Sequence, residues 1–266
     1  MNTKHAILFG ATGGIGKNLL ELLLLEGYDV LLPVRDISLA EANLQKCILG
    51  SQNSIKFTEI DLGDSHSIMD FILRFQEEEP NLLIFASGIR GANFPDDKNL
   101  DFEINYVAPL TIAIEFLRKF PSLSVINVTS SAAFRVKISS PSALFHKKNS
   151  NFGGNYAKSK LALVLASSCL SKLYPESRII SVDPGSNRTK MTLENRAPLI
   201  LRIAAMLFFS DPRVGADRVM NAILSKEITS GTHIAANGKA RDMKGHNSLV
   251  NYINLQIKKG FPYMPV

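Results

Sequence analysis

The chain has 266 residues, of which 45% are apolar and 20% are charged, and its formal net charge is +6. These totals are ordinary for a globular protein and leave room for one substantial α/β core. Its Lys and Arg residues are scattered rather than gathered in a tail. The excess charge therefore predicts attraction to anionic ligands, but no binding of nucleic acid.

Other classes of protein are excluded by what the sequence lacks. Cys47 and Cys169 have no metal-ligand spacing, so we expect no metal site. The longest apolar run, from Ala197 to Phe209, contains Arg202 and is too short to span a bilayer. Because the N-terminal residues show no signal-peptide pattern, we expect a cytoplasmic location.

Apolar segments of strand length alternate with helical patterns along most of the chain. We expect strands at Ala6–Phe9, Asp29–Val34, Ile55–Ile60, Leu82–Ala86, Val125–Val128, Ile179–Val182 and His233–Ala235. We expect helices at Ile15–Glu26, Ser38–Leu49, Ser65–Glu79, within Leu100–Phe120, and at Tyr156–Leu173 and Val214–Ser225. This alternation predicts one domain over residues 1–266, an α/β fold with a doubly wound parallel sheet of about seven strands and helices on both faces.

Two segments fall outside the alternation. Residues 135–155 are rich in Ser, Asn, Gly and Lys, which predicts a polar insertion that forms a loop or flap. Residues 186–210 leave the sheet and include the apolar stretch 198–209. Both segments follow the carboxyl ends of predicted strands, where open α/β sheets bind their ligands.

A glycine-rich turn joins the first strand to the first helix, with the sequence Phe9-Gly10-Ala11-Thr12-Gly13-Gly14-Ile15-Gly16. Gly10 permits a tight turn, the middle glycines let the backbone approach a pyrophosphate, and Gly16 permits close packing of helix on strand. The N–H groups at the start of the helix would then bind the phosphates. The turn predicts a dinucleotide-binding Rossmann fold, although a turn that only needs positive φ angles would also use glycine.

The end of the second strand selects between NAD and NADP, because an acidic residue there suits a ribose hydroxyl and an arginine suits a 2′-phosphate. Val34 fills the position expected for the acid, and Arg35 follows it. We therefore expect NADP (NADPH) rather than NAD, with Asp36 beginning a turn or capping a helix. After the third strand, Asp61 and Leu62 are placed to hold the adenine amino group, unless Asp61 is a plain turn residue.

Tyr156 and Lys160 are four positions apart, so they lie on the same face of a predicted helix. An ammonium beside a phenol favours the phenolate, and we expect Lys160 to lower the tyrosine pKa from its usual value near ~10. Such a tyrosine exchanges a proton with a carbonyl or alcohol oxygen.

The order of these motifs resembles that of the short-chain dehydrogenase/reductase family over about residues 5–192. The family's glycine motif, G-x-x-x-G-x-G, matches Gly10, Gly14 and Gly16, and its Y-x-x-x-K matches Tyr156 and Lys160. Further family positions are matched by Asn105, by a serine within Asn127–Ala133, and by Asp183-Pro184-Gly185 followed by Thr189 and Met191.

This resemblance implies a catalytic set of Asn105, Ser130, Tyr156 and Lys160. Tyr156 would be the general acid in reduction and the base in oxidation, and Lys160 would also bind the nicotinamide ribose. A serine hydroxyl would hold the substrate oxygen, and the family pattern favours Ser130 over Ser131. Asn105 would help to hold a water that relays protons to Lys160.

The resemblance also extends the predicted cofactor site. Pro184, Gly185 and Thr189 would border the nicotinamide, with the Thr189 hydroxyl reaching its carboxamide or a phosphate. The complete predicted set is Gly10, Thr12, Gly13, Gly14, Ile15, Gly16, Arg35, Asp61, Leu62, Ala86, Ser87, Gly88, Tyr156, Lys160, Pro184, Gly185 and Thr189.

The chain departs from the family in three places. Phe9 stands where a threonine is usual, and Phe85-Ala86-Ser87-Gly88 replaces the usual N-N-A-G. The 26 positions from Ser130 to Tyr156 are about twice the usual spacing, which is the polar insertion 135–155. The missing amides normally support the cofactor loop, so this departure bears on cofactor binding rather than on proton transfer.

Together these observations predict an NADPH-dependent oxidoreductase that transfers hydride between the nicotinamide and a carbonyl or alcohol substrate. Residues 198–209 occupy the family's substrate-lid region and would favour an apolar substrate, unless they pack on the core or on another subunit. The alternative is a catalytically idle NADP(H)-binding regulator, although such proteins commonly lose the tyrosine or the lysine. The family also implies a homodimer or homotetramer.

Overall fold

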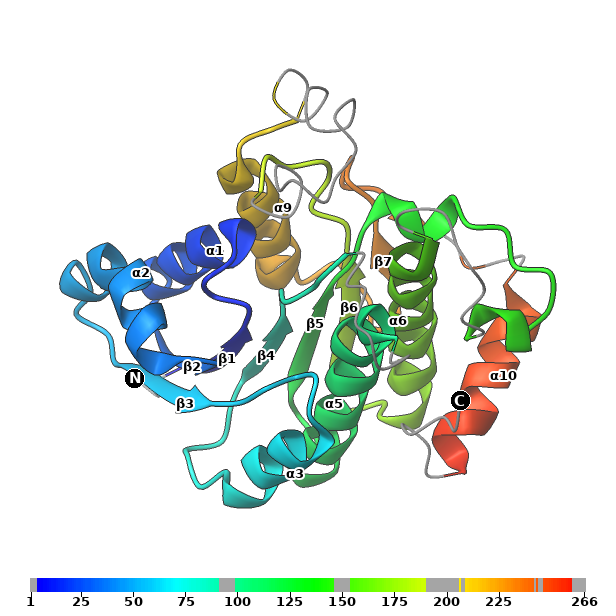
Figure 1. Ribbon diagram of the computed structural model, residues 1–266, viewed down its shortest axis with the longest axis horizontal. Coiled ribbons are helices and arrows are strands. Elements are labelled where there is room, and N and C mark those ends of the chain that lie inside the picture. The colour runs from blue at the N-terminus through cyan, green and yellow to red at the C-terminus, as the bar shows by residue number, and fades with distance from the viewer. Residues whose placement is uncertain are drawn as a thin grey trace.

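The computed structural model describes residues 4–90, 99–145, 154–189, 206, 209–241, 243 and 246–259. Its centre is an eight-stranded sheet in the order β3-β2-β1-β4-β5-β6-β7-β8 (Figure 1). The strands are β1 Lys4–Phe9, β2 Tyr28–Val34, β3 Ile55–Glu59, β4 Leu82–Phe85, β5 Ser124–Val128, β6 Arg178–Val182, β7 His233–Ile234 and β8 Ala240–Arg241. The seven predicted strands are present and parallel, which confirms the fold class. The eighth strand was not predicted, and it pairs antiparallel with β7.

Helices cover both faces of the sheet, as predicted. The α-helices are α1 Gly14–Leu25, α2 Ile37–Leu49, α3 Ser65–Arg74, α4 Leu100–Phe102, α5 Ala108–Lys119, α6 Gly154–Leu173, α9 Pro212–Leu224 and α10 Asn247–Lys258. Shorter turns are the π-helical η1 Glu103–Val107 and the 3₁₀ turns η2 Ser131–Phe134 and η3 Ser142–Leu144. α1, α2 and α9 pack on one face, whereas α3, α5, α6 and α10 lie on the other (Figure 1).

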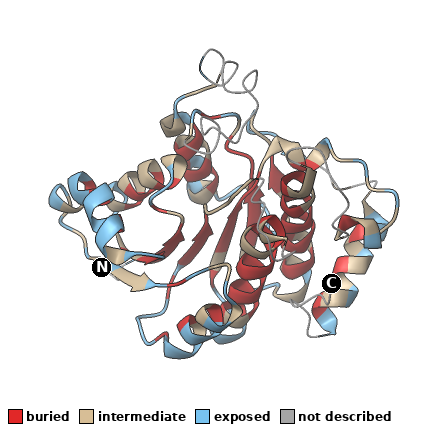
Figure 2. Cartoon of the chain, in the orientation of Figure 1, coloured by how far each residue is buried: buried red, intermediate tan, exposed pale blue. Residues whose placement is uncertain are grey.

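The two-sided core follows from the alternation of side chains along each strand. In β1, Ala6 and Leu8 join the cluster beneath α1 and α9, whereas Ile7 and Phe9 join the cluster beneath α5 and α6. Figure 2 shows the central strands together with α5 and α6 as largely buried. A sheet buried on both faces has continuous apolar strands, and its free carboxyl edge carries the polar residues of the site.

Helix α3 is shorter than predicted. It ends at Arg74 rather than Glu79, because Phe75 has an extended backbone with ψ of 107°. That turn places the Phe75 ring against Phe71 and Phe116, with centroid distances of 6.2 and 4.8 Å. Burial of the Phe75 ring therefore takes precedence over continuation of the helix.

Helix α10 was not predicted, and it lies against α6. Its side chains Leu249 and Ile253 are buried, and the Cys169 thiol of α6 donates to the Val250 carbonyl at 3.4 Å. The C-terminal part of the chain thus supports the helix that carries Tyr156 and Lys160. Within the described residues, no helix is both long and apolar enough to cross a membrane.

Candidate active site

Tyr156 and Lys160 lie one turn apart on α6, as predicted, and both are buried, with 7% and 4% of their surfaces exposed. The Lys160 ammonium donates to the Val128 carbonyl at 3.0 Å and to the Ser87 carbonyl at 3.5 Å. These carbonyls belong to the end of β5 and to the loop after β4. Burial lowers the pKa of Lys160 to about 8. The lysine therefore links α6 to the carboxyl edge of the sheet.

Ser130 follows β5 and lies beside the tyrosine. Its side chain forms a hydrogen bond with Tyr156, and its hydroxyl also accepts from the Ala132 N–H at 3.3 Å. Ser131 instead gives a backbone N–H to the Asp183 carboxylate. The structure thus brings the Ser130 hydroxyl to Tyr156, in agreement with the choice that the family pattern suggested.

Arg90 contacts Tyr156, and this contact was not predicted from the sequence. The guanidinium carbon of Arg90 lies 4.4 Å from the centroid of the Tyr156 ring. Burial raises the pKa of Tyr156, and the strongest opposing effects are the Arg90 charge and the hydrogen bond from Ser130. Lys160 is not among the groups that shift this pKa, and its ammonium donates to the two backbone carbonyls, so its predicted effect on Tyr156 stays a prediction.

Asn105 lies in the π-helical turn η1 and is fully buried. Its amide oxygen accepts from the Ile89 N–H at 2.8 Å, and its amide nitrogen donates to the Ile89 carbonyl at 2.9 Å. The same nitrogen donates to the Ser159 hydroxyl at 3.1 Å. Asn105 therefore fixes the loop after β4, and its side chain is occupied by that task rather than aimed at Lys160.

Because Gly88 has no Cβ atom, the loop after β4 can approach Asn105 and Lys160 closely. A Cβ atom there would lie 3.2 Å from the Asn105 amide oxygen and 3.3 Å from the Lys160 nitrogen. Ala86, Ser87 and Gly88 therefore run between the catalytic candidates and the glycine turn. Among the described residues, the buried Ser87 hydroxyl has no hydrogen-bond partner.

The glycine turn forms a tight backbone cradle. Gly10 has a φ of +85°, and a Cβ atom there would lie 2.5 Å from the Ser87 nitrogen. A Cβ atom on Gly16 would lie 2.0 Å from the Gly10 carbonyl oxygen. Gly13 caps α1 without any side-chain hydrogen bond, so Thr12, Gly13, Gly14 and Ile15 surround a helix start made of backbone N–H groups. This cradle, beside the unpaired Ser87 hydroxyl, fits the pyrophosphate of a dinucleotide.

The residues at the ends of β2 and β3 differ in how their side chains are engaged. Arg35 is exposed. The Asp36 carboxylate caps α2 and accepts from the Leu39 N–H at 2.8 Å, which confirms the predicted capping role. The Asp61 carboxylate accepts from the Gly63 N–H at 2.8 Å, as a turn residue does, and Leu62 is half-buried against the core.

The turn after β6 reaches the start of α1. The Asp183 carboxylate accepts from the Gly185 N–H at 2.9 Å. It also binds the Ser131 backbone, so it connects this turn to the turn after β5. Gly185 has a φ of +83°, and the Pro184 carbonyl accepts from Arg218 at 2.8 Å. The Thr189 methyl lies 3.3 Å from where a Cβ atom on Gly14 would be. The predicted residues of both turns therefore meet at one edge of the sheet.

The two segments outside the alternation are described only in part. In the insertion 135–155, residues 146–153 lie outside the described residues. The part before them is anchored, because Leu144 is fully buried and the Phe145 ring lies 5.7 Å from those of Phe102 and Tyr106. The predicted loop or flap is therefore fixed by apolar burial in its described first half.

Of segment 186–210, residues 190–205, 207 and 208 lie outside the described residues, and these include almost all of the apolar stretch 198–209. The two ends of the segment are side by side. Asn187 and Ser210 form a parallel bridge, in which the Arg188 N–H donates to the Ser210 carbonyl at 2.9 Å. The segment therefore departs and returns at one place, next to the start of α9.

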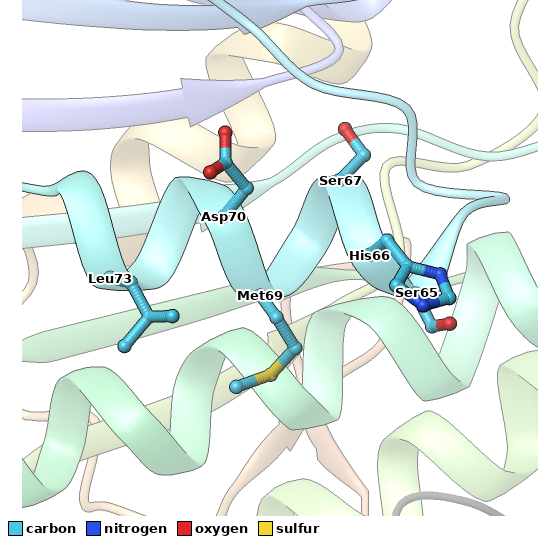
Figure 3. Close-up of a pocket in the computed structure, with 6 residues that line it drawn as sticks. All are labelled: Ser65, His66, Ser67, Met69, Asp70 and Leu73. Atoms are coloured by element: carbon cyan, nitrogen blue, oxygen red, sulfur yellow. The ribbon is translucent and has the colours of Figure 1, made fainter.

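A separate hollow lies along the outer side of α3, with exposed Met69 and Leu73 side chains beside His66 (Figure 3). Each of its six lining residues belongs to α3, and none is a predicted site residue. The hollow is therefore a feature of the helix surface rather than part of the edge described above.

Comparison with known proteins decides the family. A family model described as short chain dehydrogenase matches residues 4–199. The chain belongs to this family. It is an NAD(P)-dependent oxidoreductase with the Rossmann-type fold predicted from the glycine turn. The first of its curated relatives is mouse retinol dehydrogenase 11, which is 29% identical over 87% of this chain and 77% of its own length. Human retinol dehydrogenase 12 is 27% identical, over 85% and 74% of the two chains.

Solved structures share the fold. A short-chain dehydrogenase from Sphingobium yanoikuyae in complex with NADPH has a TM-score of 0.67 and 16% identity, over 85% of this chain and 87% of that one. A 4-hydroxyisoleucine dehydrogenase complexed with NADH has the same TM-score and 22% identity, over 88% and 97%. Members of this fold thus bind either nicotinamide cofactor.

Proposed function

We propose that the chain is an NADPH-dependent oxidoreductase for a carbonyl or alcohol substrate, with Tyr156 as its general acid and base. The observation that carries this proposal is the hydrogen bond between Ser130 and Tyr156 at the carboxyl edge of the sheet, beside the glycine cradle. Two hydroxyl groups meet there, so one substrate oxygen could accept from both of them.

The proton chemistry follows from this pair. The nicotinamide, when bound, supplies or accepts the hydride at the substrate carbon. In reduction, Tyr156 donates its phenolic proton to the substrate oxygen as negative charge develops there, and in oxidation its phenolate takes that proton back. Ser130 donates a hydrogen bond that holds the oxygen in place. Lys160 would hold the cofactor ribose.

The preference for NADPH rests on two neighbouring residues. Arg35 is exposed at the end of β2, and a guanidinium there would bind a 2′-phosphate with two parallel hydrogen bonds. The Asp36 carboxylate, which would favour a ribose hydroxyl, is held by the N-terminus of α2. Both features favour NADPH over NADH.

An apolar substrate is the class that we propose. The stretch 198–209 is apolar, and the segment 186–210 that contains it leaves and rejoins the fold beside Thr189. The two curated relatives described above are named for retinol, an apolar alcohol. An apolar lid would favour such compounds by removing their surface from water.

The test is the variant Tyr156→Phe, with Tyr28→Phe as a matched control outside the site. We expect Tyr156→Phe to lower kcat/KM by about 10²–10⁴-fold, while NADPH binding, followed by its fluorescence, is retained. Substrates would be a panel of ketones, aldehydes, quinones and retinal. Near wild-type turnover by Tyr156→Phe would overturn the proposal. Tight NADPH binding without oxidation of NADPH by any compound would favour the idle regulator instead.

We propose a homodimer or homotetramer, as the family resemblance suggests, and a cytoplasmic location. In this chain α10 lies against α6 and covers part of that helix. Light scattering coupled to gel filtration measures the assembly, and cell fractionation measures the location.

A further inference from the structure

Arg90 is a half-buried cation at the tyrosine that neither the family motifs nor the proposed mechanism use. Its guanidinium carbon lies 4.4 Å from the Tyr156 ring centroid, and its side chain also hydrogen-bonds the tyrosine side chain. The Arg90 Nε atom is buried and has no hydrogen-bond partner among the described residues. Because this nitrogen has no partner in the described part of the chain, the contact with Tyr156 is the interaction of the guanidinium that the structure defines.

The backbone that carries Arg90 is held in place. Both the N–H and the carbonyl of the preceding residue, Ile89, are bound by the Asn105 amide at 2.8 and 2.9 Å. Gly88 fits tightly between Asn105 and Lys160. The backbone at Arg90 is therefore fixed by the buried Asn105 amide, which helps to set the position of the guanidinium over the Tyr156 ring.

The other groups that face Tyr156 come from the end of β6, from its own helix α6 and from the turn after β5. Asp183 at the end of β6 disfavours the phenolate, but it is itself balanced by Arg218 and Arg135. Lys160 on α6 donates to backbone carbonyls, and Ser130 after β5 supplies a neutral hydrogen bond. Arg90 is thus the cation that acts most directly on the tyrosine. A guanidinium over an aromatic face stabilises an anionic ring more than a neutral one.

We propose that Arg90 is a positioning residue that stabilises the Tyr156 phenolate, a task that the sequence pattern assigns to Lys160. This inference rests on the proposed role of Tyr156. It means that oxidation, which needs the phenolate, extends to lower pH in the wild-type protein than it would without Arg90.

The test compares Arg90→Met and Arg90→Lys with a surface control, Arg118→Met, whose arginine pairs with Glu115 on the outside of α5. Removing the cation raises the pKa of Tyr156, so the acidic limb of kcat/KM for alcohol oxidation should move to higher pH. We expect a shift of about one unit or more for Arg90→Met, less for Arg90→Lys, and none for the control. An unmoved limb in Arg90→Met would overturn the inference.

A second readout does not require turnover. Tyrosinate absorbance is titrated for wild type and for Arg90→Met, each minus the same protein carrying Tyr156→Phe, with circular dichroism to verify folding at each pH. The Tyr156 signal should titrate at higher pH, or be lost from the folded range, in Arg90→Met. Equal titrations would reject the role of Arg90 even if no substrate is ever found. If Arg90→Met raised KM for acidic carbonyl compounds alone and left both pH readouts unchanged, Arg90 would bind substrate instead.

Discussion

Phe9 and Phe85 are register partners on the adjacent strands β1 and β4, and their rings stack with centroids 5.0 Å apart at an interplanar angle of 20°. These are the two positions at which the chain departs from the family's threonine and first asparagine. The departures are therefore coupled, because a stacked aromatic pair replaces polar groups on neighbouring strands. Phe71 closes the pair edge-on, 5.7 Å from Phe9.

Restoring a single family residue should therefore destabilise the protein. Phe85→Asn would bury an amide against the Phe9 ring and remove a fully packed side chain, at a cost of roughly 3 kcal/mol in the free energy of unfolding. Phe9→Thr should have a similar effect. The double variant should lose less than the sum of the two, as urea denaturation would measure. Strict additivity would show that the two positions are independent.

The glycine turn should discriminate between two neighbouring substitutions. In Gly16→Ala the new Cβ would lie 2.0 Å from a backbone oxygen, so the turn must distort, and stability and cofactor binding should both fall. In Gly14→Ala the new methyl would lie 3.3 Å from the Thr189 methyl and 3.4 Å from Pro212, which are side chains able to shift. Helix propensity also favours alanine, so the free energy of unfolding of Gly14→Ala should lie within about 1 kcal/mol of the wild-type value. Equal losses in thermal and urea unfolding would contradict this reading.

Arg35 should determine cofactor choice. We expect Arg35→Ala to raise KM for NADPH by about tenfold or more, since one charge-assisted pair is lost, and to leave KM for NADH unchanged. Arg74→Ala is the matched control, because Arg74 is an exposed arginine paired with Asp70 on α3. Steady-state kinetics with both cofactors would measure the effect. A parallel loss for NADPH and NADH would show that Arg35 does not read the phosphate.

His233 should make the protein sensitive to acid. Burial lowers its pKa to about 4 from an ordinary value of 6.5, and its ring shares a hydrogen bond of 3.0 Å with the Ser181 hydroxyl. His233 is therefore protonated below pH ~6.5 in the unfolded chain, whereas in the folded protein it stays neutral down to about pH 4. Stability should fall across this window by about 3 kcal/mol. The loss should be reduced in His233→Gln but persist in His66→Gln, whose histidine is exposed. Urea unfolding at pH 7 and pH 4.5 provides the comparison.

The sequence predicted what is encoded over short distances. Apolar runs located the seven parallel strands, and the glycine turn located the cofactor cradle, because each depends on neighbouring residues. α10 was missed because its apolar positions have a partner, α6, that only the folded chain supplies. β8 was missed because two exposed residues, Ala240 and Arg241, carry no strand pattern.

The electrostatics of the site lay beyond the sequence for the same reason. The i,i+4 spacing correctly placed Tyr156 and Lys160 on one helix, but it could not show which cation contacts the ring. Arg90 follows a strand 66 positions before Tyr156, and its position depends on Asn105, which binds the backbone of the preceding residue, Ile89. The one available signal was its place just after Gly88, at the edge where ligands bind.

The bridge between Asn187 and Ser210 has a consequence for how this protein could diversify. Because Asn187 and Ser210 pair at the catalytic edge, the chain leaves the described fold and rejoins it at a single point, the neck of the intervening segment. The free energy of closing a loop depends only weakly on its length. A different segment could be spliced in at this neck while β6, α9 and the tyrosine stay in place. Replacing the segment between Asn187 and Ser210 could therefore change the substrate while the catalytic residues keep their positions.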